Sequence, residues 1–316
     1  MAFSGGPDSS ALLHALHELA PVLRLSLVAA HVDHRQRPGS EKDLVYCRRV
    51  AARLGLPVLT ETLPGGRMSE AELRDHRYAC LSRAAAMVGA SGIAVGHTRD
   101  DRAETFLLNL VRGSGSRGLG SMRVEALHHD ARIVRPMLEA SRAEVLSFLE
   151  AGGWRHVVDA SNADRRIDRN RIRHELLPLI ETIRPGATAA IARAAEVLSQ
   201  EADYLRRIAR RAMSRRDGAP QPIPPRLHAA AARVLAREVI AEGGLVADVG
   251  LDTIDEVLRA ARATRKDGVV RHLPLRGSRV VEVTRAGIRI VRGFRGRPGA
   301  AAPGQKKSTT REKSIS

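Results

Sequence analysis

The sequence predicts an α/β fold with a parallel sheet, because strand and helix patterns alternate along its first half. Apolar runs such as "RLSLVAAHVDH" (24–34) and "GIAVGH" (92–97) are typical of buried strands, and apolar residues at helical spacing follow each of them. The polar clusters "SGGPDS", "HVDH" and "GHTRDD" fall at or just after expected strand ends. Parallel sheets bind ligands at the carboxyl ends of their strands, so we expect one site there, with helices on both faces.

The remaining elements follow in order along the chain. In the first half, helices are expected at about 9–20, 41–54, 69–88, 98–111 and 139–151, and strands at 24–34, 56–63, 92–97 and 131–138. A polar stretch over 159–180 enters a helix at about residue 170. After a break at "RPGATAA" (184–190), helices at about 188–214, 226–242 and 250–262 lead to a small β element with Gly277 and Gly287 at its turns.

This order divides the chain into three parts. Residues 1–185 form the sheet domain, and residues 186–295 form a helical region with a small β module. The polar, basic tail at 296–316 is predicted to be disordered.

The composition indicates a polyanionic partner. Lysine and arginine number 52 against 35 acidic residues, which gives a net charge of +17. Forty-seven of the 52 are arginine, so a GC-rich genome is an alternative cause of the enrichment. No apolar run reaches the ~20 residues that a membrane span needs, and we expect a cytoplasmic protein. The two cysteines, Cys47 and Cys80, are too far apart in sequence to indicate a disulfide framework or a cysteine zinc site.

The opening stretch "SGGPDSS" is typical of a phosphate-binding turn at the start of a helix. Gly5 and Gly6 permit close backbone approach, Ser4 and Ser9 offer hydroxyls, and the helix offers free N–H groups. Asp8 would repel phosphate unless a Mg²⁺ ion bridges the two. The alternative is an ordinary glycine-rich turn with a capping residue. No G-x-x-x-x-G-K-S/T pattern occurs, so the sequence does not indicate a Walker-type NTPase.

Two acids lie three residues apart on one helix face. Asp101 and Glu104 follow "GHT" in the helix expected at 98–111. Either they complement the helix dipole, or they stand beside a phosphate site and need a metal ion or a cationic amine between them.

Arginines accompany both features. Arg74 and Arg77 share a face of the helix at 69–88, and Arg169, Arg171 and Arg173 stand where the polar loop enters a helix. They are either solvated surface charges or ligands of a phosphoryl group or RNA backbone.

Together these motifs resemble the tRNA(Ile)-lysidine synthetase family of the N-type ATP pyrophosphatase, or PP-loop, superfamily. The resemblance covers about residues 4–179 and rests on "SGGPDSSALLH", "HVDHRQRPGS", "LRDHRYACL", "GHTRDDRAETFLLNLVRGSGSRGLGSM", "RPMLEASRAEVLSFL" and "DASNADRRIDRNRIRHELLP". It implies a Rossmann-like sheet of the adenine nucleotide alpha hydrolase type. It also implies that the helical and β region at 186–295 binds tRNA.

The resemblance implies a ligase reaction in two steps. The oxygen on carbon 2 of the wobble cytidine of tRNA(Ile), anticodon CAU, attacks the α-phosphate of ATP, and pyrophosphate leaves. The ε-amine of free L-lysine then displaces AMP and gives lysidine. A homodimer is a possible assembly.

The same resemblance assigns roles to residues. Catalytic roles fall to Asp8, Arg77, Asp101 and Glu104; Asp8 also holds Mg²⁺, and Asp101 and Glu104 bind the lysine. The ATP-binding set is Ser4, Gly5, Gly6, Pro7, Asp8, Ser9, His31, Val32, Asp33 and His97. Contacts with tRNA or phosphate fall to Arg74, Arg169, Arg171 and Arg173.

Two other functions are weighed against this one. A PP-loop tRNA thiolase, such as a 2-thiocytidine synthetase, typically needs reactive or cluster-binding cysteines, and Cys47 and Cys80 match no such pattern. The second is an RNA-binding relative that has lost catalysis.

The stretch ahead of the turn is shorter than the family resemblance implies. In the resembling family an apolar strand of about six residues leads into "SGG", whereas only "MAF" precedes it here. We expect Met1 to be a misassigned start, and a sheet shortened in this way to be poorly stable and to bind ATP weakly.

Overall fold

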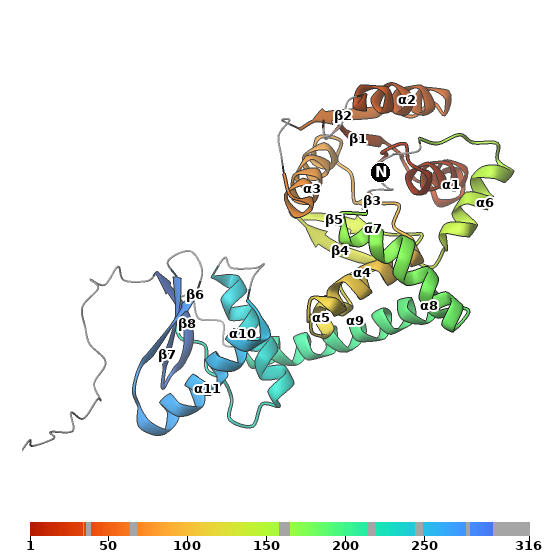
Figure 1. Cartoon of the computed structure of the whole chain (residues 1–316). Helices are drawn as coiled ribbons and strands as arrows, with labels where there is room; N and C mark the ends of the chain where they lie inside the picture. Colours follow the sequence, from red (N-terminus) through yellow and green to blue (C-terminus); the bar gives the residue numbers. More distant parts are fainter. Residues whose placement is uncertain are drawn as a thin grey trace, which may run out of the picture. The chain divides into compact units, whose positions relative to one another are not determined.

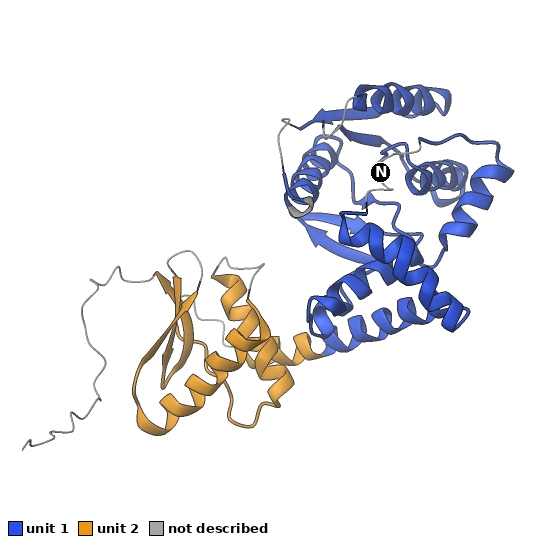
Figure 2. Ribbon diagram, in the orientation of Figure 1, with its two compact units in different colours: residues 1–204 blue, residues 205–316 orange. Residues whose placement is uncertain are grey.

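The computed structural model describes residues 1–33, 35, 39–63, 68–157, 165–213, 219–243, 249–275 and 279–292 (Figure 1). The chain forms two compact units, residues 1–204 and 205–316 (Figure 2). No helix among the described residues is long and apolar enough to span a membrane. The predicted tail at 296–316 lies outside the described residues, and the predicted domain borders stay predictions.

The sheet of the first unit has two halves. In one half β1 (Ala29–Asp33) pairs in parallel with β2 (Val58–Thr62). In the other, β3 (Ile93–Ala94) pairs in parallel with β5 (Ala131–Val134), and β4 (Glu125–His128) pairs antiparallel with β5. The predicted α/β fold with a parallel sheet is confirmed.

The first three residues join these halves. The N–H of Phe3 donates to the carbonyl of Ala30 at 2.8 Å, and the N–H of Ala30 donates to the carbonyl of Met1 at 2.8 Å. On the other side, the N–H of Ala2 donates to the carbonyl of Ala94 at 2.9 Å. Residues 1–3 therefore lie as a short strand between β1 and β3, and "SGG" begins at its carboxyl end.

Helices cover both faces of this sheet, as predicted. The helices of this unit are α1 (Pro7–Leu23), α2 (Ser40–Arg53), α3 (Glu70–Met87), α4 (Arg99–Val111), α5 (Ser116–Leu119), α6 (Arg142–Ala151), α7 (Asp168–Arg171) and α8 (Leu177–Ile183), with a π-helical turn, η2 (Ile172–Leu176), between the last two. Phe3 packs in one buried cluster with α1 and α2, whereas its neighbour Ala2 packs with α3. Successive strand residues face opposite sides, so these helices lie on opposite faces.

The second unit contains the predicted helical region and small β module. After α9 (Ala187–Ala212), which begins in the first unit, come α10 (Ala229–Glu242) and α11 (Leu251–Asp267). They precede an antiparallel sheet of β6 (Arg271–Leu275), β7 (Arg279–Thr284) and β8 (Gly287–Arg292). Buried apolar residues of both helices, β7 and β8 form one core, and the partly buried Leu273 and Leu275 of β6 pack against it.

Several elements differ from the sequence prediction. The strands expected at 92–97 and 131–138 cover only Ile93–Ala94 and Ala131–Val134. The strand expected at 24–34 covers only Ala29–Asp33, because α1 extends to Leu23 and ends at Arg24 in the left-handed conformation, with φ of 53°. The hairpin of β4 and β5 was not predicted over residues 125–130, because its strands are four residues each and half exposed.

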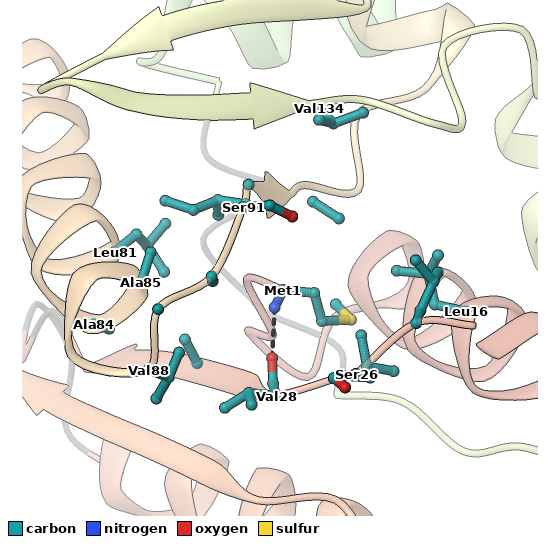
Figure 3. A pocket seen from close by; sticks show the side chains of 18 of the residues that line it. Met1, Leu16, Ser26, Val28, Leu81, Ala84, Ala85, Val88, Ser91 and Val134 are labelled. Carbon is teal, nitrogen blue, oxygen red and sulfur yellow. Dashed lines mark hydrogen bonds between the residues drawn. The ribbon is translucent and has the colours of Figure 1, made fainter. Parts of the chain in front are cut away.

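An apolar cavity of about 510 Å³ lies beyond the amino end of residues 1–3 (Figure 3). Leu16, Val28, Ala85 and Val88 are among its lining residues. The Met1 ammonium stands at this cavity and donates to the carbonyl of Val28 at 2.5 Å. Burial lowers the pKa of this amine to about 6 from its usual 8.0. The cavity thus continues the line of the central strand, with residues 25–28 ahead of β1 and residues 89–92 ahead of β3 among its lining.

We expect an apolar, β-forming segment of five or six residues, joined ahead of Met1, to fill this cavity and stabilise the first unit. The melting temperature at pH 6.5 should rise by roughly 3–6 °C, because apolar area is buried and a buried amine, which must lose its proton on folding, is replaced by a peptide group. The gain should shrink above pH 8, where the Met1 amine of the unextended chain is already neutral. A Gly/Ser segment of equal length is the control; equal melting temperatures for both extensions would contradict the expectation.

Candidate functional site

The turn at residues 4–10 is held by its own serines. Gly5 has a φ of +83°, which glycine adopts without strain. The hydroxyl of Ser10 donates to the carbonyl of Gly5, and that of Ser9 to the carbonyl of Gly6, both at 3.1 Å. Gly6 is the N-cap of α1 and offers no side chain, so no side-chain cap occupies the N–H groups of the first turn. These N–H groups, at the positive end of the helix, suit an anion.

Gly96, which the sequence analysis did not single out, lets the turn pack against the end of β3. A Cβ atom on Gly96 would lie 2.8 Å from the carbonyl oxygen of Asp8 and 3.1 Å from the backbone nitrogen of Ser9. The backbone of α1 therefore touches the strand end directly. In the sequence, a glycine just after a buried strand is the signal that indicates such a close approach of two backbones.

Both predicted acids are buried at the start of α4. Thr98 caps this helix, and its N–H and hydroxyl donate to Oδ2 of Asp101 at 2.9 and 3.0 Å. Glu104, one turn on, is only 1% exposed. One oxygen of Asp101 therefore caps the helix, while its Oδ1 and both oxygens of Glu104 have other partners.

Those partners are two of the three predicted arginines. Arg173 of η2 donates to both oxygens of Glu104, at 2.5 and 2.8 Å, and Arg169 of α7 donates to Oε2 of Glu104 at 2.9 Å. Both arginines also reach Oδ1 of Asp101, at 3.1 and 3.2 Å. Arg171 is exposed and instead pairs with Glu175 at 3.5 Å. The structure brings Arg169 and Arg173 to the acids, and Arg171 is not among their partners.

Arg142 links Asp101 to Asp8 of the turn at residues 4–10. Its guanidinium lies 3.5 Å from Oδ2 of Asp8 and 3.9 Å from Oδ1 of Asp101. Arg142 lies within one of the motifs quoted above but received no role from it. We call Asp8, Asp101, Glu104, Arg142, Arg169 and Arg173 the charge cluster: three carboxylates face three guanidinium groups, so their formal charges cancel.

Asp8 carries a polar atom without a partner. Its Oδ1 is buried and has no hydrogen-bond partner among the described residues. Burial raises the pKa of Asp8 to about 6, with Arg142 opposing and Asp101 adding to the rise. Burial acts in the same direction on Asp101, but Arg169 and its other cationic neighbours hold that pKa below its usual value. An ionised Asp8 thus lacks a counter-charge at Oδ1, where a cation fits.

His97 and Arg77 lie near this cluster. Arg135 donates to Nδ1 of His97 at 3.1 Å, and burial lowers the pKa of His97 to about 3, aided by neighbouring arginines. The imidazole is therefore a neutral acceptor. Burial also lowers the pKa of Arg77, whose guanidinium lies 5.4 Å from the ring centre of Tyr78. Arg74 contacts the same ring at 5.8 Å but is exposed.

The predicted residues at the end of β1 are His31, Val32 and Asp33, and His31 contacts the strand that leads into the turn. Nδ1 of the buried His31 bonds to the carbonyl of Phe3 at 2.9 Å. Val32 packs in the apolar cluster beneath α3. The Asp33 carboxylate accepts the N–H of Arg35 at 2.9 Å, which helps hold its pKa below the usual value against the effect of burial. Their observed contacts are structural.

Comparison with known proteins identifies the family of this domain. The profile described as a PP-loop domain matches residues 1–180. The chain belongs to this PP-loop family. It is 41% identical over 223 residues to the tRNA(Ile)-lysidine synthase of Symbiobacterium thermophilum, covering 68% of this chain and 46% of that protein. With the enzyme of the same name from a Synechococcus species it shares 40% identity over 206 residues, 65% of this chain and 63% of that protein. The chain thus spans about half to two thirds of these relatives.

The fold agrees with this membership. A U34-tRNA thiolase from Methanococcus maripaludis superimposes with a TM-score of 0.55 at 17% identity, over 63% of this chain and 70% of that one. At this identity the likeness concerns the fold alone. The PP-loop of this chain is the turn at residues 4–10.

We expect Asp8→Asn to stabilise the PP-loop domain in the absence of divalent ions. A buried Asp with a raised pKa favours folding when protonated, so its stabilising effect is present below about pH 4 and is lost as pH rises through about 6. At pH 7.5 the variant should gain about 1–2 kcal/mol in the free energy of unfolding, and the difference should vanish near pH 4. Urea titrations in EDTA at both pH values measure this; a constant difference would contradict it.

Gly96→Ala tests the contact between β3 and α1. The added methyl group meets backbone rather than a flexible side chain, so we expect a loss of about 1–3 kcal/mol and a displaced PP-loop. Gly115→Ala, at a glycine with open space around it and no positive φ, is the control for an added methyl group without a clash. Equal losses in the two variants would show that the close approach costs nothing.

Proposed function

We propose that this chain joins lysine to carbon 2 of the wobble cytidine of tRNA(Ile) with a CAU anticodon, at the expense of ATP. The observation that carries the proposal is the buried acid pair, Asp101 and Glu104, held next to Asp8 of the PP-loop. Membership of the PP-loop family and identity of about 40% to enzymes named tRNA(Ile)-lysidine synthase support it.

The charge cluster accounts for the need for a divalent ion. The formal charges of the cluster cancel one another, so most of the negative charge of a bound triphosphate must be neutralised by a cation that binds with it. Mg²⁺ suits this role because it prefers carboxylate and phosphate oxygens, and it would neutralise charge on the phosphates. Asp8 fits the ion, since its Oδ1 is buried and has no partner among the described residues.

Both substrates can be accommodated by an exchange of partners. Arg169 and Arg173 now occupy the carboxylates of Asp101 and Glu104. When ATP binds, the two guanidinium groups can turn to its phosphate oxygens, which accept bidentate hydrogen bonds as carboxylates do. The freed carboxylates then bind the ammonium groups of lysine. Asp101 and Glu104 thus stay paired with Arg169 and Arg173 until ATP and lysine bind.

The reaction itself needs placement and charge stabilisation. The oxygen on carbon 2 of cytidine attacks the α-phosphorus, and the bond to pyrophosphate breaks. Arg77, a cation half-buried beside His97, would stabilise the α-phosphate. The lysine ε-amine, having given a proton to a carboxylate of the acid pair or to water, attacks carbon 2, and AMP leaves with the bonding electrons. No covalent intermediate on the protein is needed.

The cysteines favour this reaction over sulfur transfer. Cys47 is fully buried, and burial raises the pKa of its thiol to about 12. Burial likewise raises the pKa of Cys80 to about 11. Both thiols stay protonated and therefore poorly nucleophilic near neutral pH. The tRNA contacts of the second unit stay a prediction, which the net charge of +17 supports. A homodimer and a cytoplasmic location also stay predictions.

The test combines the chain with ATP, Mg²⁺, labelled lysine and a tRNA(Ile) transcript with a CAU anticodon. We expect label in the tRNA in a one-to-one ratio with released pyrophosphate, and none with a transcript whose wobble base is uridine. Binding of the transcript without a lysine-dependent product would instead support an RNA-binding relative. Incorporation of sulfur would support the thiolase.

Glu104→Gln should impair the lysine step more than the adenylation step. The substitution keeps the shape of the side chain but removes one of the two charges that would hold the lysine, so the KM for lysine should rise by about 30-fold or more. Formation of adenylated tRNA without lysine should change by less than about fivefold. Glu175→Gln is the matched control, because Glu175 pairs with Arg171 at the surface. A uniform loss in both steps would contradict a role in lysine binding.

A further inference from the structure

A second group of ligating side chains lies outside the charge cluster, where the turn between β4 and β5 meets α3. Asp75 of α3, His128 and His129 each offer one ligand atom, and these three atoms lie within 4.8 Å of one another. Nε2 of His129 and Oδ1 of Asp75 are 2.9 Å apart. Two imidazoles and a carboxylate thus converge on one point at the surface, and the mechanism proposed above uses none of them.

The backbone of the turn is specialised for this placement. His129 and Asp130, its two central residues, have φ of 47° and 61°, the left-handed region that few residues other than Gly, Asn, Asp and His adopt. Asn-Gly or Gly-Gly would form this two-residue turn with less strain. Retained strain of this kind is typical of sites at which a side chain must point in a set direction.

The ring of His128 is already oriented. It stacks on the ring of the buried Tyr78 of α3, with ring centres 4.4 Å apart and planes inclined by 22°. The hydroxyl of Ser82, also on α3, donates to the carbonyl of His128 at 3.3 Å. Contacts with α3 therefore fix the ring of His128, while the side chains of His129 and Asp75 are exposed and free to rotate.

We propose that Asp75, His128 and His129 form a binding site for a divalent transition-metal ion, with Zn²⁺ as the ion that fits best. Two neutral imidazoles and one carboxylate are a ligand set that zinc accepts, with water in the fourth position. Tetrahedral zinc places its ligand atoms about 3.3–3.5 Å apart, given bond lengths of about 2.0–2.2 Å. The three ligand atoms already lie within 4.8 Å of one another, and His129 is in contact with Asp75 at 2.9 Å.

A metal here would join the hairpin to α3, the helix that carries Arg74 and Arg77. Both guanidinium groups lie over Tyr78, the residue on which His128 stacks. The ion would therefore hold the same face of α3 that presents these arginines. The site does not depend on the proposed function, because its ligands are separate from the charge cluster.

The test uses the untagged full chain, stripped with EDTA and titrated with ZnCl₂ in calorimetry. We expect one saturable ion per chain with a dissociation constant in the micromolar range, and a rise of roughly 3–6 °C in melting temperature at saturation. Co²⁺ in place of Zn²⁺ should give the intense visible absorption of a four-coordinate site. Hydrogen exchange should slow in residues 125–134 when zinc is present.

Variants separate the site from non-specific binding to other histidines. His129→Ala and Asp75→Asn should each weaken zinc binding by tenfold or more; Asn keeps a hydrogen-bonding group at position 75 but removes the charged ligand. His272→Ala is the matched control, because among the described residues His272 pairs with a single carboxylate, that of Glu282 at 3.4 Å. Zinc binding that is unchanged in the first two variants, or absent from the unaltered chain, would overturn the proposal.

Discussion

The main-chain hydrogen bonds of residues 1–3 are the constraint on which the first unit depends. They are the bonds that link β1 to β3, and so they decide where the two halves of the sheet stand relative to each other. The PP-loop follows this strand directly, β1 supports it through His31, and Gly96 touches it from the end of β3. A shift of the short strand would therefore move Asp8 relative to α4. The cavity at Met1 marks the place where this constraint is weakest.

The charge cluster is the second constraint, and it explains how so many ionised groups are tolerated in a buried place. Three carboxylates and three guanidinium groups neutralise one another, and the shortest contacts are bidentate, which offsets the cost of removing charge from water. Asp8 is the exception, with one oxygen lacking a partner among the described residues. Without a ligand, the charges of the cluster are paired except at Oδ1 of Asp8, where a cation would bind.

The sequence predicted the order of helices and strands, because period and turn residues are local signals, and it predicted the PP-loop and the acid pair, because they form short motifs. It did not predict which arginine meets which acid. Arg169 and Arg173 differ from Arg171 only through the register of α7 and η2, and Arg142 reaches Asp8 across 134 positions of the chain. The sequence did not indicate the turn of His129 and Asp130, because these residues are not the Asn-Gly or Gly-Gly pair typical of a two-residue hairpin turn.

Asp101 shows how one side chain serves fold and site together. Its Oδ2 completes the capping box with Thr98 and so sets where α4 begins, while its Oδ1 faces Arg142, Arg169 and Arg173. A glutamate at this position would carry its carboxylate one methylene further and could not keep both sets of contacts unchanged. The start of the helix and the position of the charge are therefore coupled through two oxygens of one carboxylate. This coupling fixes Glu104 as well, because it lies on the same face one turn further along α4.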